Sequence, residues 1–288
     1  MPRFISLRTA VRVSVTVTAT TLLIQACGGG GDDGPGAEVA ATPTTPATPP
    51  TVRDFGLQGA VGGTLTGTNA QDIIVVVDAN GSLWGVYGTG AANDFKVTGL
   101  LTGSGGGNPT TTSYRWDATD WGRPGNDASR SPSVRIDLSL DLARPAMSGT
   151  VTSATDTRTI AGGALPADGY QPTAAATLDT VRGHWELTTS GGRPLSIDIA
   201  ADGRISGMSG LCAVAFGSAI KPGASGSNIF ALEMHFNPAS RSCSEPFAAS
   251  DGVYGFALAY APIGGGLQLV IGALNGWDPV YLTAAGKR

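Results

Sequence analysis

The sequence has little charge, and positive charge is the scarcer kind. Charged residues make up 14% of the 288 residues, with 18 Lys and Arg against 22 Asp and Glu. Binding to the phosphates of nucleic acid needs a basic surface, which this composition does not supply. Nucleic acid is therefore not an expected partner.

Histidine is scarcer still, since the chain has only His184 and His235. Histidine is the side chain that most readily serves as a general base near neutral pH. Both histidines fall on the polar side of an alternating pattern, so solvent-facing strand positions are the favoured interpretation. A ligand or catalytic role for either one is the alternative.

Catalytic motifs are also missing. Residues 207–211 read GMSGL and lack the final glycine of a serine-hydrolase elbow. The glycine-rich segment 103–108 has no lysine with which to hold a phosphate. We therefore predict no catalytic residue, no metal and no cofactor, and we predict that the protein is not an enzyme.

One group of oxygen ligands is the best candidate for a hard cation such as calcium. It consists of Asp117, Asp120, Asn126 and Asp127. Carboxylate and amide oxygens suit calcium, but the spacing matches no EF-hand loop. An ordinary acidic loop is the favoured interpretation.

The sequence also lacks helical periodicity, since no stretch of ten or more residues sustains it. Residues 134–142 (VRIDLSLDL) instead alternate with a period of two, and similar runs recur along the chain. Forty-three glycines and 18 prolines separate these runs, and Asx-Gly pairs such as Asn80 with Gly81 indicate hairpins. The predicted fold class is all-β and antiparallel, as small barrels or as a sandwich.

A weak internal repeat indicates that the β-rich part has two halves. Residues 75–88 align with residues 197–210 at an offset of 122, each copy reading as strand, Asx-Gly turn and strand. We predict two tandem β-units, 53–172 and 173–288, joined through the polar and alanine-rich segment 170–179. In the second unit Gly255, Ala257 and Ala259 share one strand face, which predicts close sheet packing or a narrow interior.

Cysteine is rare, and the first of the three cysteines has the most informative surroundings. Cys27 follows an uncharged segment, 13–24, with three arginines upstream and Ala26 directly before it. That segment is shorter than the roughly 20 residues of a membrane-spanning helix. A basic start followed by a short apolar region is typical of a secretory signal. Residues 1–26 resemble the signal peptide and lipobox of bacterial lipoproteins.

This resemblance implies cleavage before Cys27 and attachment of lipid to its thiol, with palmitate-type chains as the membrane anchor. Several acyl chains together hold a protein firmly to a bilayer. In these lipoproteins an aspartate after the cysteine favours the inner membrane, whereas this chain has Gly28. The resemblance therefore implies the outer membrane. Cys212 and Cys243 then remain in an oxidising compartment, where a disulfide is the expected state.

The segment 27–52 is dense in Gly, Pro and Thr and almost free of large apolar residues. This composition predicts a disordered tether, with a reach of about 25–30 Å or more. Loss of residues 1–26 would leave 15 basic and 22 acidic residues, a net charge of −7.

Over most of its length the chain resembles a group of uncharacterised proteobacterial lipoproteins. The resemblance rests on the lipobox, the Asx-Gly hairpins, the join between Tyr170 and Trp185, and the Cys212 and Cys243 pair. It implies the architecture of a glycine-rich tether followed by two β-rich halves, and no activity. The chain is also similar to surface lipoproteins with small β-barrels, such as factor H-binding and transferrin-binding proteins, without any matching partner-binding residue.

Trp121 stands in a polar segment and is the candidate binding anchor, because an exposed tryptophan there would suit a protein interface. Local packing of Trp121 is the favoured interpretation. Core packing accounts most simply for Trp84 and Trp185. The leading hypothesis is an outer-membrane lipoprotein that serves as a binding or interaction module, on the periplasmic or the surface face. The alternatives are a periplasm-facing, lipocalin-like carrier of a small apolar ligand and a hydrolase of envelope glycans or lipids. A protein partner or a small apolar ligand is expected, besides the membrane.

Overall fold

The computed structural model describes residues 58–67, 69–108, 110–122, 132–167, 170–223, 227–237, 252–275 and 281–288. These residues belong to one compact unit and form seventeen strands and one short helix. Within these ranges, no helix has the length and apolar character needed to cross a membrane. The predicted signal peptide, Cys27 and the tether lie outside the described residues.

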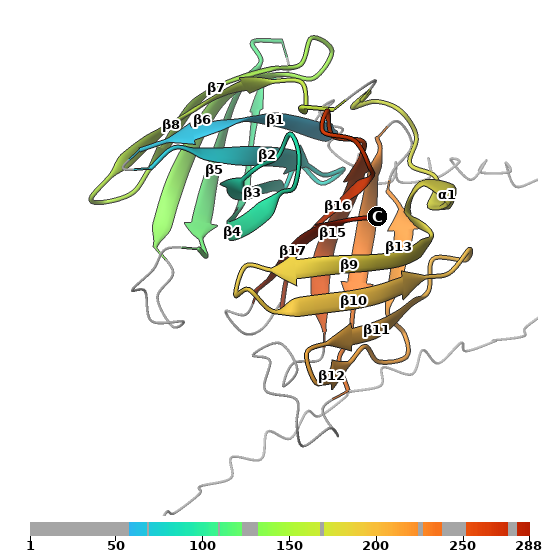
Figure 1. Cartoon of the computed structure of the whole chain (residues 1–288). Coiled ribbons are helices and arrows are strands. Elements are labelled where there is room, and N and C mark those ends of the chain that lie inside the picture. Colours follow the sequence, from blue (N-terminus) through green and yellow to red (C-terminus); the bar gives the residue numbers. More distant parts are fainter. Residues whose placement is uncertain are drawn as a thin grey trace, which may run out of the picture. The chain divides into compact units, whose positions relative to one another are not determined.

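The first β-unit is an eight-stranded barrel. Its strands are β1 (Gly59–Thr66), β2 (Gln71–Val77), β3 (Leu83–Thr89), β4 (Lys96–Asn108), β5 (Ser113–Asp120), β6 (Ser133–Asp141), β7 (Ala146–Thr152) and β8 (Thr157–Gly163). Each strand pairs antiparallel with the next, and β8 pairs with β1 to close the barrel, in blue to yellow-green in Figure 1. Closure removes the free strand edges of this sheet.

The barrel follows from the alternation that the sequence shows. In β6 the side chains of Val134, Ile136, Leu138 and Leu140 are buried, while Arg135 between them is exposed. A strand with side chains on alternating faces places one face inside a closed sheet.

Large side chains of the chain itself fill the barrel interior. Trp116 is 1% exposed and stacks on Tyr114 with 5.6 Å between ring centroids. The Trp116 indole N–H donates to the carbonyl oxygen of Gly81 at 2.9 Å. An eight-stranded barrel has an interior just wide enough for side chains, and here they occupy it.

The second β-unit is a nine-stranded curled sheet preceded by the helix α1 (Leu178–Val181). Its strands are β9 (Gly183–Thr189), β10 (Pro194–Ile199), β11 (Ile205–Ser209), β12 (Cys212–Ala213), β13 (Ala219–Pro222), β14 (Ile229–Met234), β15 (Val253–Tyr260), β16 (Gln268–Leu274) and β17 (Tyr281–Lys287). The strand order is β12-β11-β10-β9-β17-β16-β15-β14-β13, in yellow to red in Figure 1. Isolated bridges from Arg204 to Ala219 and from Val214 to Phe236 bring the two ends of this sheet together.

The inner face of the curled sheet buries a second core. Trp185 is fully buried there, and its indole N–H donates to the carbonyl oxygen of Val181 at 2.6 Å. Ala257 and Ala259 lie on the same inner face, so the predicted shared face of these two small residues is confirmed. The expectation of two tandem antiparallel β-units is confirmed, with a barrel and a curled sheet rather than a sandwich.

The internal repeat forms the same hairpin twice. In β2–β3 the N–H of Asp78 donates to Ser82 at 3.1 Å, and that of Gly81 donates to Asp78 at 3.0 Å. At the offset of 122, Ala200 donates to Arg204 and Gly203 donates to Ala200, both at 2.9 Å. Gly81 and Gly203 have φ angles of 78° and 84°, which glycine adopts without a steric penalty.

The two β-units share an apolar layer formed by their outer faces. Ile74 and Val76 point outward from the barrel and pack with Phe256, Leu258 and Val270 of the curled sheet, all at 2% exposure or less. The segment 170–179 lies between the last strand of the barrel and the first strand of the curled sheet, and the shared layer adds direct contact between the two units. A strand that is buried on both faces has a continuous apolar sequence. Such sequences occur at residues 73–77 (IIVVV) and 269–273 (LVIGA).

Two hydrogen bonds also cross the shared layer. The Tyr260 hydroxyl donates to the carbonyl oxygen of Ala91 at 2.9 Å, and the N–H of Phe95 donates to Gln268 Oε1 at 3.3 Å. Tyr260 and Gln268 are both buried. These bonds satisfy polar groups that would otherwise be costly in an apolar layer.

Candidate binding pockets

The pocket best equipped to hold a ligand lies where the β2–β3 hairpin faces β14 and β15, and we call it the aromatic pocket. Its volume is about 300 Å³, within the usual range for small-molecule sites of roughly 300–1,000 Å³. Its aromatic lining residues are Trp84, Phe230, Tyr254 and Phe256. The rings of Trp84 and Phe256 lie 5.8 Å apart at 59°. Polar atoms come from Asp78 and Gln58 among others.

The hairpin turn holds the Asp78 side chain in place. Asp78 Oδ1 accepts the backbone N–H groups of Asn80 at 2.8 Å and Ser82 at 3.0 Å. Asp78 Oδ2 accepts the indole N–H of Trp84 at a long 3.4 Å. No basic side chain within the described ranges pairs with Asp78. A carboxylate offers about four acceptor positions, so Oδ2 retains capacity for a ligand.

Gln58 brings a second acceptor to the aromatic pocket. Its amide oxygen Oε1 is buried and has no hydrogen-bond partner in the described part of the chain. A buried polar atom without a partner costs about 1–3 kcal/mol. Because Gln58 lines the aromatic pocket, a ligand that donated a hydrogen bond to this oxygen would remove that cost.

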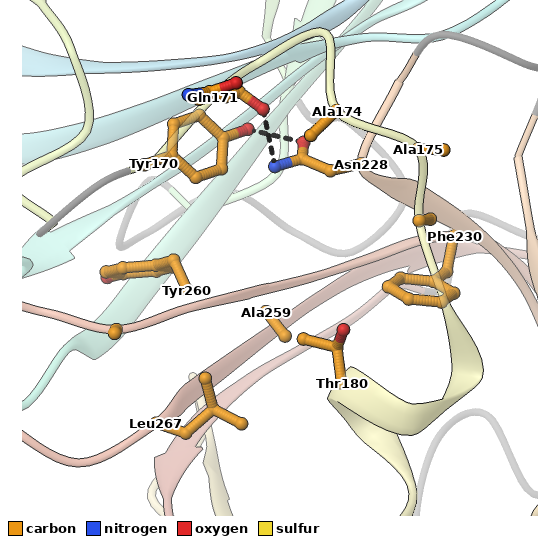
Figure 2. Close-up of a pocket in the computed structure, with 12 residues that line it drawn as sticks. Tyr170, Gln171, Ala174, Ala175, Thr180, Asn228, Phe230, Ala259, Tyr260 and Leu267 are labelled. Atoms are coloured by element: carbon orange, nitrogen blue, oxygen red, sulfur yellow. Dashed lines mark hydrogen bonds between the residues drawn. The ribbon is translucent and has the colours of Figure 1, made fainter.

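A second pocket, of about 350 Å³, lies beside the segment that joins the two β-units, and we call it the join pocket. Figure 2 shows the Tyr170 hydroxyl donating to Asn228 Oδ1 at 2.7 Å, and Asn228 Nδ2 donating to the carbonyl oxygen of Gln171 at 3.1 Å. Burial raises the pKa of Tyr170 and keeps its hydroxyl neutral. These polar groups bind one another, so the join pocket offers a ligand fewer unsatisfied atoms than the aromatic pocket.

Trp121 is half-buried, which agrees with local packing, the interpretation that we favoured over an exposed binding anchor. Its indole N–H donates to Thr102 Oγ1 at 2.8 Å, and its ring lies 6.1 Å from the ring of Tyr281. Trp121 packs against the apolar layer that the two β-units share. Local packing thus accounts for its position, and its role as a binding anchor stays a prediction.

The acidic group around Trp121 divides between two faces of β5. Asp117 is exposed and Asp120 is fully buried, because residues an odd number apart on a strand point to opposite faces. Asn126 and Asp127 lie outside the described residues. Within the described ranges, no group of three or more His, Cys, Asp or Glu side chains is arranged so that it could hold a metal ion.

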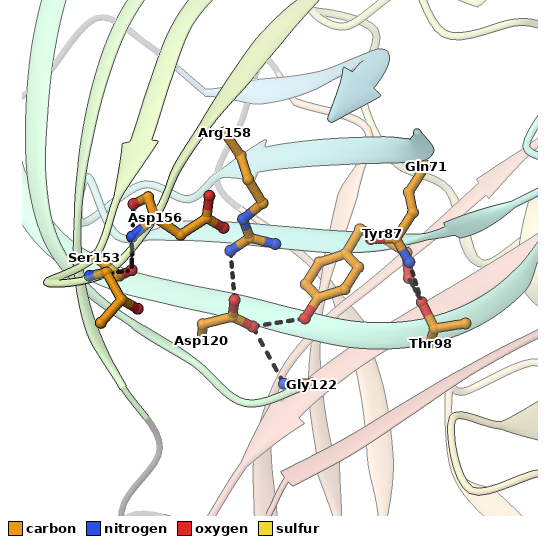
Figure 3. A network of polar contacts seen from close by, with 9 residues as sticks. Gln71, Tyr87, Thr98, Asp120, Gly122, Ser153, Asp156 and Arg158 are labelled. Carbon is orange, nitrogen blue, oxygen red and sulfur yellow. Dashed lines mark hydrogen bonds and ion pairs between the residues drawn. The ribbon is translucent and has the colours of Figure 1, made fainter. Parts of the chain in front are cut away.

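Asp120 is instead the centre of a buried polar network, shown in Figure 3. It forms an ion pair with Arg158 from β8 and accepts the hydroxyl of Tyr87 at 2.6 Å and the N–H of Gly122 at 3.3 Å. The Arg158 guanidinium also lies 5.7 Å from the centre of the Tyr87 ring. Burial and the neighbouring Asp120 raise the pKa of Tyr87, so the phenol remains a donor. This network ties β3, β5 and β8 together inside the barrel.

The two histidines lie on polar positions, each beside carboxylates. His184 on β9 is 54% exposed and contacts Glu186 Oε1 through Nε2 at 2.7 Å and Asp198 Oδ1 through Nδ1 at 3.0 Å. His235 is less exposed, and its Nε2 lies 2.8 Å from Glu233 Oε1. In the His184 group, Ser196 donates to Glu186 at 2.8 Å, not to the histidine. This arrangement differs from the serine–histidine contact of a nucleophilic triad.

We expect a raised pKa for His184 in a histidine NMR titration. Hydrogen bonds to Glu186 and then to Asp198 raise the pKa above the ordinary value of about 6.5. The stabilisation from charged His184 is therefore present below pH 6.5 and is lost as the pH rises through the higher, folded-state pKa.

Replacing Asp198 with asparagine should lower the His184 pKa toward its ordinary value, whereas Asp117→Asn on the barrel surface should leave it unchanged. An equal effect of both variants would contradict a local cause.

The remaining motif residues have structural positions. Ser209 is buried at the end of strand β11 and not on a strand-to-helix turn. Cys212 is buried and disulfide-bonded. Its expected partner Cys243 lies outside the described residues, so the pairing stays a prediction.

Searches of family models, of curated proteins and of solved structures found no match to this chain. The lipoprotein resemblance therefore stays a prediction that rests on the sequence motifs alone.

The residues of the aromatic pocket were not predicted as a site from the sequence. One sequence signal could have indicated them, because the two repeat copies differ where the first copy meets the pocket. At the offset of 122, Ala200 corresponds to Asp78 and Ser206 corresponds to Trp84. The carboxylate at position 78 and the indole at position 84 have no counterpart at the corresponding positions of the second copy, which makes them candidates for a role beyond the shared hairpin.

Proposed function

We propose that the protein is a lipid-anchored, outer-membrane binding module that takes a small ligand in the aromatic pocket. The observation that carries this proposal is the pocket itself, with aromatic walls and acceptors at Asp78 and Gln58 that retain capacity for a ligand. The motif at Cys27 and the tether 27–52 support the anchor. The shared apolar layer supports a head in which the barrel and the curled sheet act as one body.

Interior packing favours this proposal over a lipocalin-like carrier. A carrier of that type needs an open cavity inside its barrel, whereas Trp116 and other large side chains are packed together there. A hydrolase also has less support, because His184 is on an open surface rather than within one of the pockets described above. The ligand site of the proposed module is therefore on the outside of the β-units.

The anchor is tested by replacing Cys27 with serine in cells that are fed labelled palmitate. We expect the unchanged chain to carry the label and to sediment with the outer membrane, because several acyl chains bind firmly. The Cys27→Ser variant should lose the label completely.

The matched control is Ala26→Ser, which retains a small residue before the cysteine and should be labelled. Full labelling of the Cys27→Ser variant would show that the lipid is attached at another residue. Protease treatment of intact cells then separates the two faces, since only a surface-exposed head is cut before the outer membrane is opened.

A further inference from the structure

We propose that the ligand of the aromatic pocket is a small organic ammonium compound, in which a cationic amine is joined to an apolar body. This inference rests on the proposed function in taking the aromatic pocket as the ligand site of the module. It adds the charge and the chemical class of the ligand.

Two oxygen acceptors in the pocket retain capacity for a ligand, although the side chains of Asn80 and Tyr254 in its lining can also donate. Asp78 Oδ2 belongs to a carboxylate, which can only accept, and it receives one long hydrogen bond, from Trp84. Gln58 Oε1 is a carbonyl oxygen without a partner in the described ranges. An ammonium group has three donors and no acceptor, so it complements both oxygens. A carboxylate ligand would instead meet the negative charge of Asp78.

The pocket walls favour an organic cation over a metal ion. The faces of aromatic rings attract cations, and tryptophan does so most strongly. Trp84 combines such a ring with direct contact to Asp78, and Phe256 and Tyr254 offer further carbon surface to the apolar body. A hard metal ion such as calcium takes six or more oxygen ligands, whereas this pocket is walled largely by carbon.

The second copy of the repeat shows that the hairpin does not require the Asp78 carboxylate. Ala200 stands at the corresponding position, and the same two backbone hydrogen bonds form there. The Asp78 side chain is thus not needed for this type of turn. In the second copy the N–H of Arg204, which corresponds to Ser82, donates to the Asp202 carboxylate at 3.2 Å. The turn therefore does not fix the position of its carboxylate, and in the first copy the carboxylate stands beside Trp84.

The test is calorimetric titration of the full-length chain in a neutral detergent with three probes of similar shape. The probes are phenethylamine, 2-phenylethanol and phenylacetate. We expect the amine to bind at least about tenfold more tightly than the alcohol, the difference that ~1.4 kcal/mol of cation–π and ion-pair energy provides. Phenylacetate should bind least. The preference for the amine should shrink as salt is raised, because part of it is electrostatic.

Two variants locate the effect. Asp78→Asn retains the oxygen that accepts from Asn80 and Ser82 but removes the charge, so the preference for amine over alcohol should fall by about tenfold. Gln58→Met removes the unpaired acceptor and should weaken amine binding without lowering the melting temperature. Asp202→Asn, in the corresponding hairpin of the second copy, is the matched control and should bind like the unchanged chain.

The outcomes separate this inference from the proposed function. Equal affinity for the amine and the alcohol, or an unchanged preference in Asp78→Asn, would overturn the ammonium class and leave the aromatic pocket as a site. Failure of all three probes to bind would overturn both the ligand class and the pocket as the ligand site. The Cys27→Ser labelling experiment tests the anchor independently of either result.

Discussion

Replacing Asp120 with alanine is expected to lower the free energy of unfolding by about 3–5 kcal/mol, because it leaves a buried charge without its partner. Asp120 is fully buried, and the Arg158 side chain is 10% exposed. The change also removes the acceptor of the Tyr87 hydroxyl and of the Gly122 N–H. Urea unfolding followed by circular dichroism measures the loss.

Asp117→Ala is the matched control for this prediction. It also removes an aspartate carboxylate from β5, but from the exposed face of the strand. The free energy of unfolding should therefore change by no more than about 0.5 kcal/mol. Replacing Asp120 and Arg158 together with leucine should recover part of the loss, because no charge is then buried alone. Similar losses from Asp120→Ala and Asp117→Ala would show that the network is not buried in solution.

The second large effect is expected from Leu258→Ala in the layer that the two β-units share. Leu258 is 0% exposed and packs with residues of both units. Truncating such a leucine leaves a cavity and costs about 2–5 kcal/mol. Both β-units should unfold in one transition in the unchanged chain, since neither can expose this layer without cost.

The control for Leu258→Ala is Phe216→Ala, which removes a larger side chain from a position that is 94% exposed. Its effect should be within about 0.5 kcal/mol. If Leu258→Ala were equally mild, the shared layer would not be a buried interface. Unfolding in two separate steps would likewise contradict a single cooperative head.

Period-two alternation was sufficient to predict strands such as β6. Every second side chain of this strand is buried, namely Val134, Ile136, Leu138 and Leu140, and the residues between them are more exposed to solvent. This is the pattern of a strand with one face toward solvent. The Asn80 and Gly81 pair predicted a hairpin because a positive φ favours glycine, and Gly81 has one. These features depend on neighbours in the chain, so the sequence carries them directly.

The shared layer was not predicted, because we expected each strand to have one buried face and one face toward solvent. Residues 73–77 of β2 are apolar at every position, and all five are buried. One face of that strand packs inside the barrel and the other packs on the curled sheet. The same run is compatible with several kinds of buried segment, and only its partners in space distinguish them.

The candidate sites also depend on contacts that are not visible in the sequence. Asp117 and Asp120 are close in the sequence and were considered together as cation ligands, yet β5 sends them to opposite faces, and Asp120 pairs with Arg158 of β8. The aromatic pocket joins Gln58, the hairpin at Asp78, and β15, which is more than 170 residues away along the chain. No local pattern connects such residues.

By itself the sequence determined the class of fold, the antiparallel tandem arrangement, the hairpins and the polar positions of both histidines. It also carries the motif at Cys27 on which the proposed anchor rests. Tertiary structure alone decided that the first β-unit closes into a barrel, that the two units share an apolar layer, and that Trp84, Asp78 and Gln58 form one pocket. The physical reason is that alternation and turn residues specify local conformation, whereas closure, burial on a second face and pocket formation depend on contacts between segments far apart in the chain.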